Sequence, residues 1–191
     1  MTLDIMRNQK VLVMGRIGRG KSTLLKLIMK YDTPQSGQLY FEGKAYNDID
    51  ETYMRSKIGY VPQYPQLFNR TIFENITYGT SGTSKEYVHS LLVDLELEHM
   101  FDSFTDGLDM VVGKGGSKLS GGQSQVVWIL RVMLQDPEIL LLDEPTASID
   151  DTTKNVVRGL LVGMMKHDRT VVMVSHDEYL VAHVDRLIKL S

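Results

Sequence analysis

The chain has 191 residues, a formal net charge of -3 and no cysteine. This length suits one well-buried domain, and 42% hydrophobic with 24% charged residues are ordinary globular values. The charge argues against non-specific nucleic-acid binding, which needs a basic face. The absence of cysteine excludes disulfides and cysteine-metal sites. No apolar run approaches the ~20 residues that cross a bilayer, and residues 1–4 lack the features of a signal peptide.

The first part of the chain predicts a strand, a glycine loop and a helix. The apolar run 11–14 precedes Gly15–Ser22, which fits G-x-x-x-x-G-K-[ST], and a helix over 24–28 follows. Glycines let successive backbone N–H groups point into one concavity that suits a polyphosphate, although a chance glycine-rich turn is the alternative. The candidate phosphate-binding residues are Gly15, Arg16, Gly18, Arg19, Gly20, Lys21, Ser22 and Thr23.

Within this loop, we expect Lys21 to reach the β- and γ-phosphates of a nucleotide and the hydroxyl of Ser22 to bind Mg²⁺. Arg16 and Arg19 are unusual in such a loop. They either reinforce the anion site or point to water.

The remaining elements follow from turn residues, caps and apolar periodicity. The last third alternates apolar strands with helical stretches, which is typical of a mostly parallel sheet. The expected elements are a strand over 38–41 turning at 42–43, a helix over 50–56, a strand over 58–61, a helix capped by Thr71 and Glu74, helices over 84–104, loops at Gly107 and 113–116, a long helix from Ser120 to about Leu134, and strands over 139–142 and 171–174.

Two acids end the apolar strand 139–142. A buried parallel strand delivers the residue at its carboxyl end to the edge where α/β sheets bind ligands, so Asp143 is a candidate Mg²⁺ ligand. Glu144 is the candidate to orient and deprotonate an attacking water. An ordinary acidic turn is the alternative interpretation of this pair.

The segment Leu119–Gln123, Leu-Ser-Gly-Gly-Gln, carries a second signal. A serine and two glycines opening a helix predict another N-terminus that faces an anion. A structural cap by Ser120 explains the serine alone, because helix stability does not ask for Gly121 and Gly122.

In order and spacing these segments resemble the motifs of ATP-binding cassette (ABC) nucleotide-binding domains. Gly15–Ser22 resembles Walker A, Asp143–Glu144 resembles Walker B with its catalytic glutamate, and Leu119–Gln123 matches the family signature. Three further resemblances are Gln63 with the Q-loop glutamine, 148–150 with the D-loop and His176 with the H-loop histidine.

This resemblance implies an α/β fold of the P-loop NTPase (RecA-like) class, with a mostly parallel sheet flanked by helices. A helical subdomain over 64–134 would be inserted between core segments 1–63 and 135–191. ATP and Mg²⁺ are the implied cofactors. The implied roles are catalytic for Glu144, His176, Gln63 and Lys21, metal-binding for Ser22, Gln63 and Asp143, and nucleotide-binding for the phosphate loop with Ser120, Gly121, Gly122, Gln123 and Asp150.

The resemblance also implies partners. Two ABC domains would pair head to tail around two nucleotides, each held by the Walker A of one copy and by Ser120 and Gly122 of the other. A separate transmembrane domain would be driven by this pairing at the cytoplasmic face of a membrane, and no nucleic-acid partner is expected.

The segments 61–68 and 71–76 are similar to exporter-type domains, whereas His176-Asp177 is closer to importer-type ones, so the substrate class stays open. The family's adenine-stacking aromatic would precede residue 1, which indicates truncation at the N-terminus. Two alternatives remain, a soluble ABC ATPase that acts on nucleic acid or the ribosome, and a degenerate nucleotide-binding module. A neighbouring membrane-domain gene and phosphate release from Mg-ATP would discriminate among them.

Overall fold

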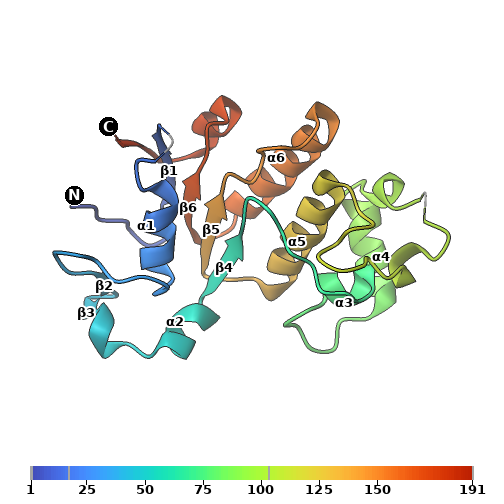
Figure 1. Cartoon of the computed structure of the whole chain (residues 1–191), viewed down its shortest axis with the longest axis horizontal. Helices are drawn as coiled ribbons and strands as arrows, with labels where there is room; N and C mark the ends of the chain where they lie inside the picture. The colour runs from blue at the N-terminus through green and yellow to red at the C-terminus, as the bar shows by residue number, and fades with distance from the viewer. Residues whose placement is uncertain (1, 17, 103, 191) are drawn as a thin grey trace. The chain divides into compact units, whose positions relative to one another are not determined.

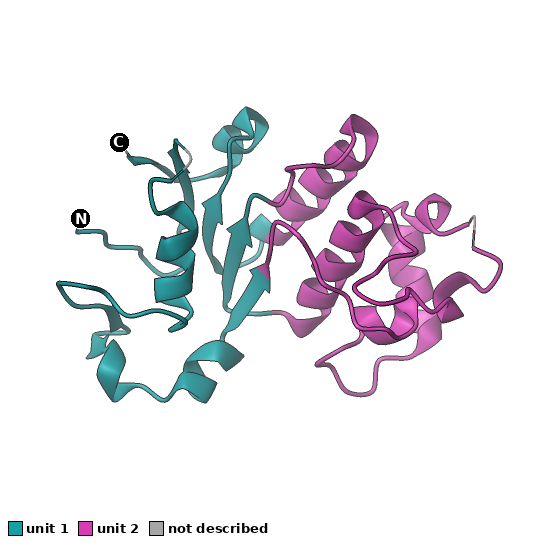
Figure 2. Ribbon diagram, in the orientation of Figure 1, with its two compact units in different colours: residues 1–60, 137–144, 165–191 teal, residues 61–136, 145–164 magenta. Residues whose placement is uncertain are grey.

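The computed structural model describes residues 2–16, 18–102 and 104–190, which form two compact units (Figures 1 and 2). Ile17 of the expected phosphate loop and Ser103 of the expected helical segment lie outside the described residues. Unit 1 comprises 1–60, 137–144 and 165–191, and unit 2 comprises 61–136 and 145–164.

A five-stranded sheet is the centre of unit 1, with the strand order β4-β5-β6-β1-β7. Strand β1 pairs in parallel with both β6 and β7, and β5 pairs in parallel with β6, which confirms the expected α/β fold with a mostly parallel sheet. The strands are β1 Lys10–Gly15, β4 Ile58–Val61, β5 Ile139–Asp143, β6 Thr170–Val174 and β7 Arg186–Leu190.

Helix α1, Lys21–Ile28, lies along the sheet beside β1 (Figure 1). Its Leu25 packs with Val11, Val13 and Leu141 in one buried cluster. The central strands are apolar at consecutive positions because parallel sheets are covered on both faces. Unit 1 also holds α2 Glu51–Ser56, capped by Asp50, and a hairpin of β2 Tyr40–Phe41 and β3 Lys44–Ala45.

Unit 2 is helical, and local caps decide where most of its helices begin. Thr71 with Glu74 and Ser120 with Gln123 form reciprocal capping boxes, and Ser84 caps the helix between them. Gly107 opens a 3-10 helix where a loop was expected. The helices are α3 Ile72–Ile76, α4 Lys85–Asp94, α5 Gly121–Gln135 and α6 Asp151–Met165, with 3-10 turns at Glu98–Met100 and Gly107–Asp109.

The two units are defined by packing alone. Residues 145–164, expected in the core, cluster with the helical residues of unit 2. The functional division into a core of 1–63 and 135–191 and a subdomain of 64–134 stays a prediction.

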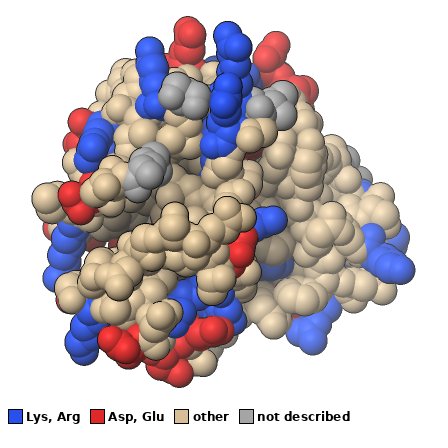
Figure 3. Space-filling view, turned by 60° about the vertical axis from the view of Figure 1, so that its left-hand side comes forward, with Lys and Arg blue, Asp and Glu red and all other residues tan. Residues whose placement is uncertain are grey.

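None of the described helices combines the length and the apolar composition that a bilayer crossing requires. On the face shown in Figure 3, basic and acidic side chains are interspersed.

Candidate active site

The phosphate loop joins β1 to α1 as the sequence predicts. Gly18 and Gly20 have φ of 82° and 80°, in the left-handed region that glycine adopts without strain. Gly20 is the N-cap of α1 and has no side chain to cap it. The first N–H groups of α1 have no acceptor within the helix, so they are available to an anion.

Gly15 is needed for a different reason. A Cβ at this position would lie 2.8 Å from the carbonyl oxygen of Leu190 in β7. The first glycine of the loop therefore lets the edge strand approach β1.

Lys21 is the first residue of α1 and is only 9% exposed. Its ammonium donates to the carbonyl oxygens of Gly15 at 2.6 Å and Arg16 at 3.3 Å, so the lysine is folded over its own loop. Arg16 and Arg19 are exposed. A buried cation and an open helix N-terminus both favour an anion at the start of α1.

Ser22 and Asp143 come together although 121 residues separate them. The hydroxyl of Ser22 donates to Oδ1 of Asp143 at 3.2 Å, and the carboxylate is nearly buried. Oδ2 of Asp143 accepts from the hydroxyl of Tyr60 at 3.4 Å. Burial raises the pKa of Tyr60 to about 12, with the negative charge of Asp143 as a further cause.

Tyr60 is a site residue that sequence reasoning missed. It was expected only as part of the strand 58–61, and it lies in β4, which neighbours β5 in the sheet. A polar aromatic residue near the carboxyl end of a strand next to the acidic one was the available signal.

Glu144 lies one residue past β5 in a left-handed conformation, with φ of 47°. Its backbone N–H donates to the carbonyl oxygen of Val174 at 2.8 Å, which ties it to the end of β6. His176 contacts its carboxylate twice. The backbone N–H of His176 donates to Oε2 at 3.3 Å, and the imidazole Nε2 lies 3.4 Å from Oε1.

The paired oxygens of Ser22 and Asp143 fit Mg²⁺. This ion prefers oxygen ligands, and in nucleotide sites it takes one or two from protein and the rest from phosphates and water. Among the described residues, no three His, Cys, Asp or Glu side chains gather in a way that could hold a metal. The two oxygens of Ser22 and Asp143 suit an ion that takes its other ligands from phosphates and water.

The second group of expected site residues lies in unit 2. Ser120 caps α5, and its Oγ accepts from the backbone N–H of Gln123 at 3.1 Å. Asp150 caps α6 by accepting from the N–H of Thr153 at 2.9 Å. This bond is the first cause that holds the pKa of Asp150 below its ordinary value.

The structure supplies a packing reason for Gly122 that the sequence did not offer. A Cβ at 122 would lie 2.4 Å from Cγ2 of Thr153, so only glycine permits this approach of α5 to α6. At Gly121 the nearest atom to such a Cβ would be the carbonyl oxygen of Ser148, at 3.9 Å. Packing therefore explains Gly122, whereas a Cβ at Gly121 would make only an ordinary van der Waals contact.

Gln63 lies two residues past the end of β4, and its side chain is half-buried. Unit 1 thus brings Ser22 to Asp143 and Glu144 to His176, whereas Gln63, Ser120 and Asp150 belong to unit 2.

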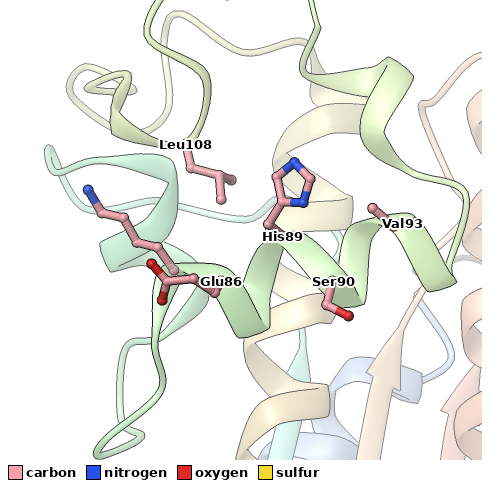
Figure 4. A pocket seen from close by; sticks show the side chains of 6 residues that line it. Glu86, His89, Ser90, Val93 and Leu108 are labelled. Atoms are coloured by element: carbon pink, nitrogen blue, oxygen red, sulfur yellow. The ribbon is translucent and has the colours of Figure 1, made fainter.

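A hollow of about 620 Å³ lies elsewhere in unit 2, along α4 (Figure 4). Leu108 approaches the α4 side chains from the facing segment, and Lys85 forms an ion pair with Asp109 at 2.5 Å. None of the predicted site residues lines this hollow, whose lining is Lys85, Glu86, His89, Ser90, Val93 and Leu108.

Comparison with known proteins identifies the fold that carries these residues. A solved structure described as a bacterial Atm1-family ABC exporter with ATP bound is similar to 99% of this chain, with a TM-score of 0.86 and 31% identity. This chain covers 33% of that one. The sheet and its helices are therefore similar to part of an ABC exporter of the P-loop NTPase class.

Curated relatives are similar over the whole chain. The mitochondrial iron-sulfur clusters transporter ABCB7 of Rattus norvegicus is 35% identical over 190 residues, and ABC transporter B family member 21 of Arabidopsis thaliana is 37% identical over 186 residues. The chain spans 25% of the first relative and 14% of the second. A family profile described as ABC transporter matches residues 1–147, so this chain belongs to the ABC transporter family.

Proposed function

We propose that this chain is the nucleotide-binding domain of an ABC exporter, which binds and hydrolyses Mg-ATP. The observation that carries this proposal is the pairing of the Ser22 hydroxyl with the Asp143 carboxylate at 3.2 Å, at the open N-terminus of α1. The end of a phosphate loop and the end of a buried acidic strand share one metal-binding position there. An incidental glycine-rich turn would not need that partner.

Phosphate binding is assigned to the loop and the first turn of α1. The backbone N–H groups at the start of α1, after Gly20, and the ammonium of Lys21 donate to phosphate oxygens, and the dipole of α1 favours their charge. The lysine exchanges its bonds to the carbonyls of Gly15 and Arg16 for bonds to phosphate. Arg16, Arg19 and Thr23 are assigned to the rim of the same anion site because all three are exposed beside it.

Ser22 and Asp143 would hold Mg²⁺, the first through its hydroxyl and the second directly or through water. The ion supplies neutralisation of the charge that develops on the phosphate oxygens. Tyr60 keeps the second carboxylate oxygen of Asp143 occupied, so that Oδ1 faces Ser22.

Glu144 is assigned as the group that orients and deprotonates the attacking water. Its carboxylate is the next side chain after the metal-binding Asp143 and is held by the backbone and the imidazole of His176. Gln63 is assigned to the metal or the water on the family resemblance alone. Water attacks the γ-phosphorus, the bond to the β–γ bridging oxygen breaks, and ADP and phosphate leave.

The residues of unit 2 are assigned to a second copy's nucleotide. The γ-phosphate of a nucleotide bound to a partner ABC domain would be contacted by the hydroxyl of Ser120 and the N–H groups of Gly121 and Gly122. Asp150 would lie at the same interface. The closed pair would drive a transmembrane domain, as the exporters among its relatives suggest. We expect this activity at the cytoplasmic face of a membrane.

The test measures phosphate release and nucleotide binding on the purified chain. Lys21→Ala is expected to remove ATP binding, and Glu144→Gln is expected to keep binding while turnover falls by about 10²–10⁴-fold. Unchanged turnover in Glu144→Gln would contradict the assignment of the base. No phosphate release from the unmodified chain would favour the degenerate module instead.

A further inference from the structure

Both ends of the Gln123 side-chain amide are bonded to protein. Its Oε1 accepts from the backbone N–H of Ser120 at 2.9 Å, and its Nε2 donates to the carbonyl oxygen of Met100 at 2.8 Å. Its own backbone N–H donates to Oγ of Ser120 at 3.1 Å. All three residues belong to unit 2. A turn of this amide toward a ligand would break two good hydrogen bonds.

A second capping box in the same unit shows what the amide adds. At α3, Oε2 of Glu74 accepts from the N–H of Thr71 at 2.8 Å, and the N–H of Glu74 donates to Oγ1 of Thr71 at 3.0 Å. A carboxylate therefore completes such a cap as well as an amide does. Only the bond from Nε2 to Met100 requires glutamine at 123, because a carboxylate there would face a carbonyl oxygen with no proton to donate.

The Met100 bond ties the start of α5 to the 3-10 turn Glu98–Met100, whose last carbonyls lack partners within the turn. Ser120, Gln123 and Met100 line one hollow of about 250 Å³ together with His99, Thr152, Thr153 and Val156. The cap is thus anchored on a neighbouring element and does not depend on the helix end alone.

The arrangement also decides what Ser120 can offer to a ligand. Its Oγ already accepts the N–H of Gln123, so its hydroxyl hydrogen is the group left to point outward. The N–H groups of Gly121 and Gly122, in the first turn of α5, are donors too. With Oε1 of Gln123 turned back to Ser120, this helix end presents donors, which is what an anion needs.

We propose that Gln123 is a positioning residue: it orients the Ser120 hydroxyl as a donor toward the γ-phosphate of a partner's nucleotide and does not itself contact nucleotide. This inference rests on the proposed function and reassigns Gln123 from the nucleotide-binding residues that the family resemblance implies. The exchange Gln123→Glu separates the two roles of the side chain, since it keeps the cap, loses the Met100 bond and adds a negative charge beside the anion.

The test uses the full chain with Glu144→Gln to block hydrolysis and compares Gln123→Glu, Gln123→Ala and the reverse exchange Glu74→Gln. ATP affinity of the monomer is measured with a fluorescent ATP analogue, and ATP-driven pairing is measured by light scattering. We expect Gln123→Glu to weaken ATP-driven pairing by at least about tenfold. This is the size expected for loss of the charge-assisted hydrogen bond from the Ser120 hydroxyl to the partner's γ-phosphate. Monomer affinity should stay within about twofold, and Glu74→Gln should match the parent in both measurements.

Equal pairing of Gln123→Glu and the parent would overturn the positioning role. So would a parallel loss of monomer affinity, because these residues are assigned to a partner's nucleotide and such a loss would indicate general damage to the chain. Failure of the parent itself to bind ATP or to pair would instead contradict the proposed function.

A second readout needs no nucleotide. Hydrogen exchange at the Ser120 amide should stay slow in Gln123→Glu, which keeps the acceptor, and quicken by about tenfold or more in Gln123→Ala. The segment 98–102 should exchange faster in both variants because both lose the bond to Met100. Equal exchange at Ser120 in Gln123→Ala and the parent would refute the cap on which the inference stands, whatever the outcome with ATP.

Discussion

Glu144 and His176 are joined at both carboxylate oxygens, one by the histidine backbone at 3.3 Å and the other by its imidazole at 3.4 Å. Replacement of the His176 side chain removes the imidazole contact and leaves the backbone hydrogen bond to Glu144. We therefore expect His176→Ala to keep the fold and ATP binding while kcat falls by about 10²-fold, since the base loses its orientation. Steady-state phosphate release measures this, with the exposed His183→Ala in the same unit as control. A fall of KM with kcat unchanged would contradict the role of His176 in orienting Glu144.

The approach of Gly122 to Thr153 predicts a defined cost. Gly122→Ala would bring a methyl group within 2.4 Å of Cγ2 of Thr153, and overpacking of this kind costs about 1–3 kcal/mol of unfolding free energy. Gly121→Ala is the matched control, because its Cβ meets only an oxygen at 3.9 Å. Urea denaturation measures the unfolding free energy of both variants. Thr153→Ala should recover part of the loss in the double variant, and no recovery would show that the contact is not the cause.

Arg131 links α5 to α3 through Asn75. It is 4% exposed, and it donates to the backbone oxygen of Asn75 at 2.6 Å and to Oδ1 of Asn75 at 2.8 Å. Its guanidinium lies 4.4 Å from the ring centre of Trp128, and burial lowers its pKa to about 10. Loss of bonds to a buried charged group predicts that Arg131→Ala costs about 3 kcal/mol.

Chemical denaturation measures the cost of Arg131→Ala. Arg131→Lys should recover only part of the loss, because an ammonium cannot reproduce the planar fork. Arg70→Ala, an exposed residue of the same unit, should change stability by less than about 0.5 kcal/mol. Equal effects at 70 and 131 would contradict this account.

The caps of α3 and α6 predict a loss of stability in acid. Backbone bonds from Thr71 and Thr153 are the first causes that lower the pKa values of Glu74 and Asp150 from 4.5 and 3.8. Each carboxylate thus binds its proton more weakly in the folded chain than in the unfolded chain. Their contribution is present above these ordinary values and is lost as the pH falls through the lower folded ones.

Glu74→Gln and Asp150→Asn keep the hydrogen-bond acceptor of each cap but do not titrate. The double variant should therefore lose less stability than the parent below about pH 4.5, as measured by urea midpoints across this range. If the urea midpoints of the parent and the double variant fall equally as the pH is lowered, other titrating groups cause the loss of stability in acid.

The elements that the sequence predicted correctly are those decided by neighbours along the chain. Thr71 pairs with Glu74 three residues on, and Ser120 caps the helix that it opens, so residue order alone located the starts of α3 and α5. The apolar run before Asp143 and the spacing of Gly15–Ser22 likewise placed the strand and the loop. Strand β7 was missed because its residues alternate at an exposed edge and form no apolar run.

Relationships between distant residues needed the tertiary structure. The bond of Tyr60 to Asp143 spans 83 residues, the bond of Gln123 to Met100 crosses between two elements, and the fit of Gly122 against Thr153 depends on how two helices pack. A one-dimensional pattern records residue types and local spacing, whereas these contacts depend on the packing of segments that the chain brings together only when it folds.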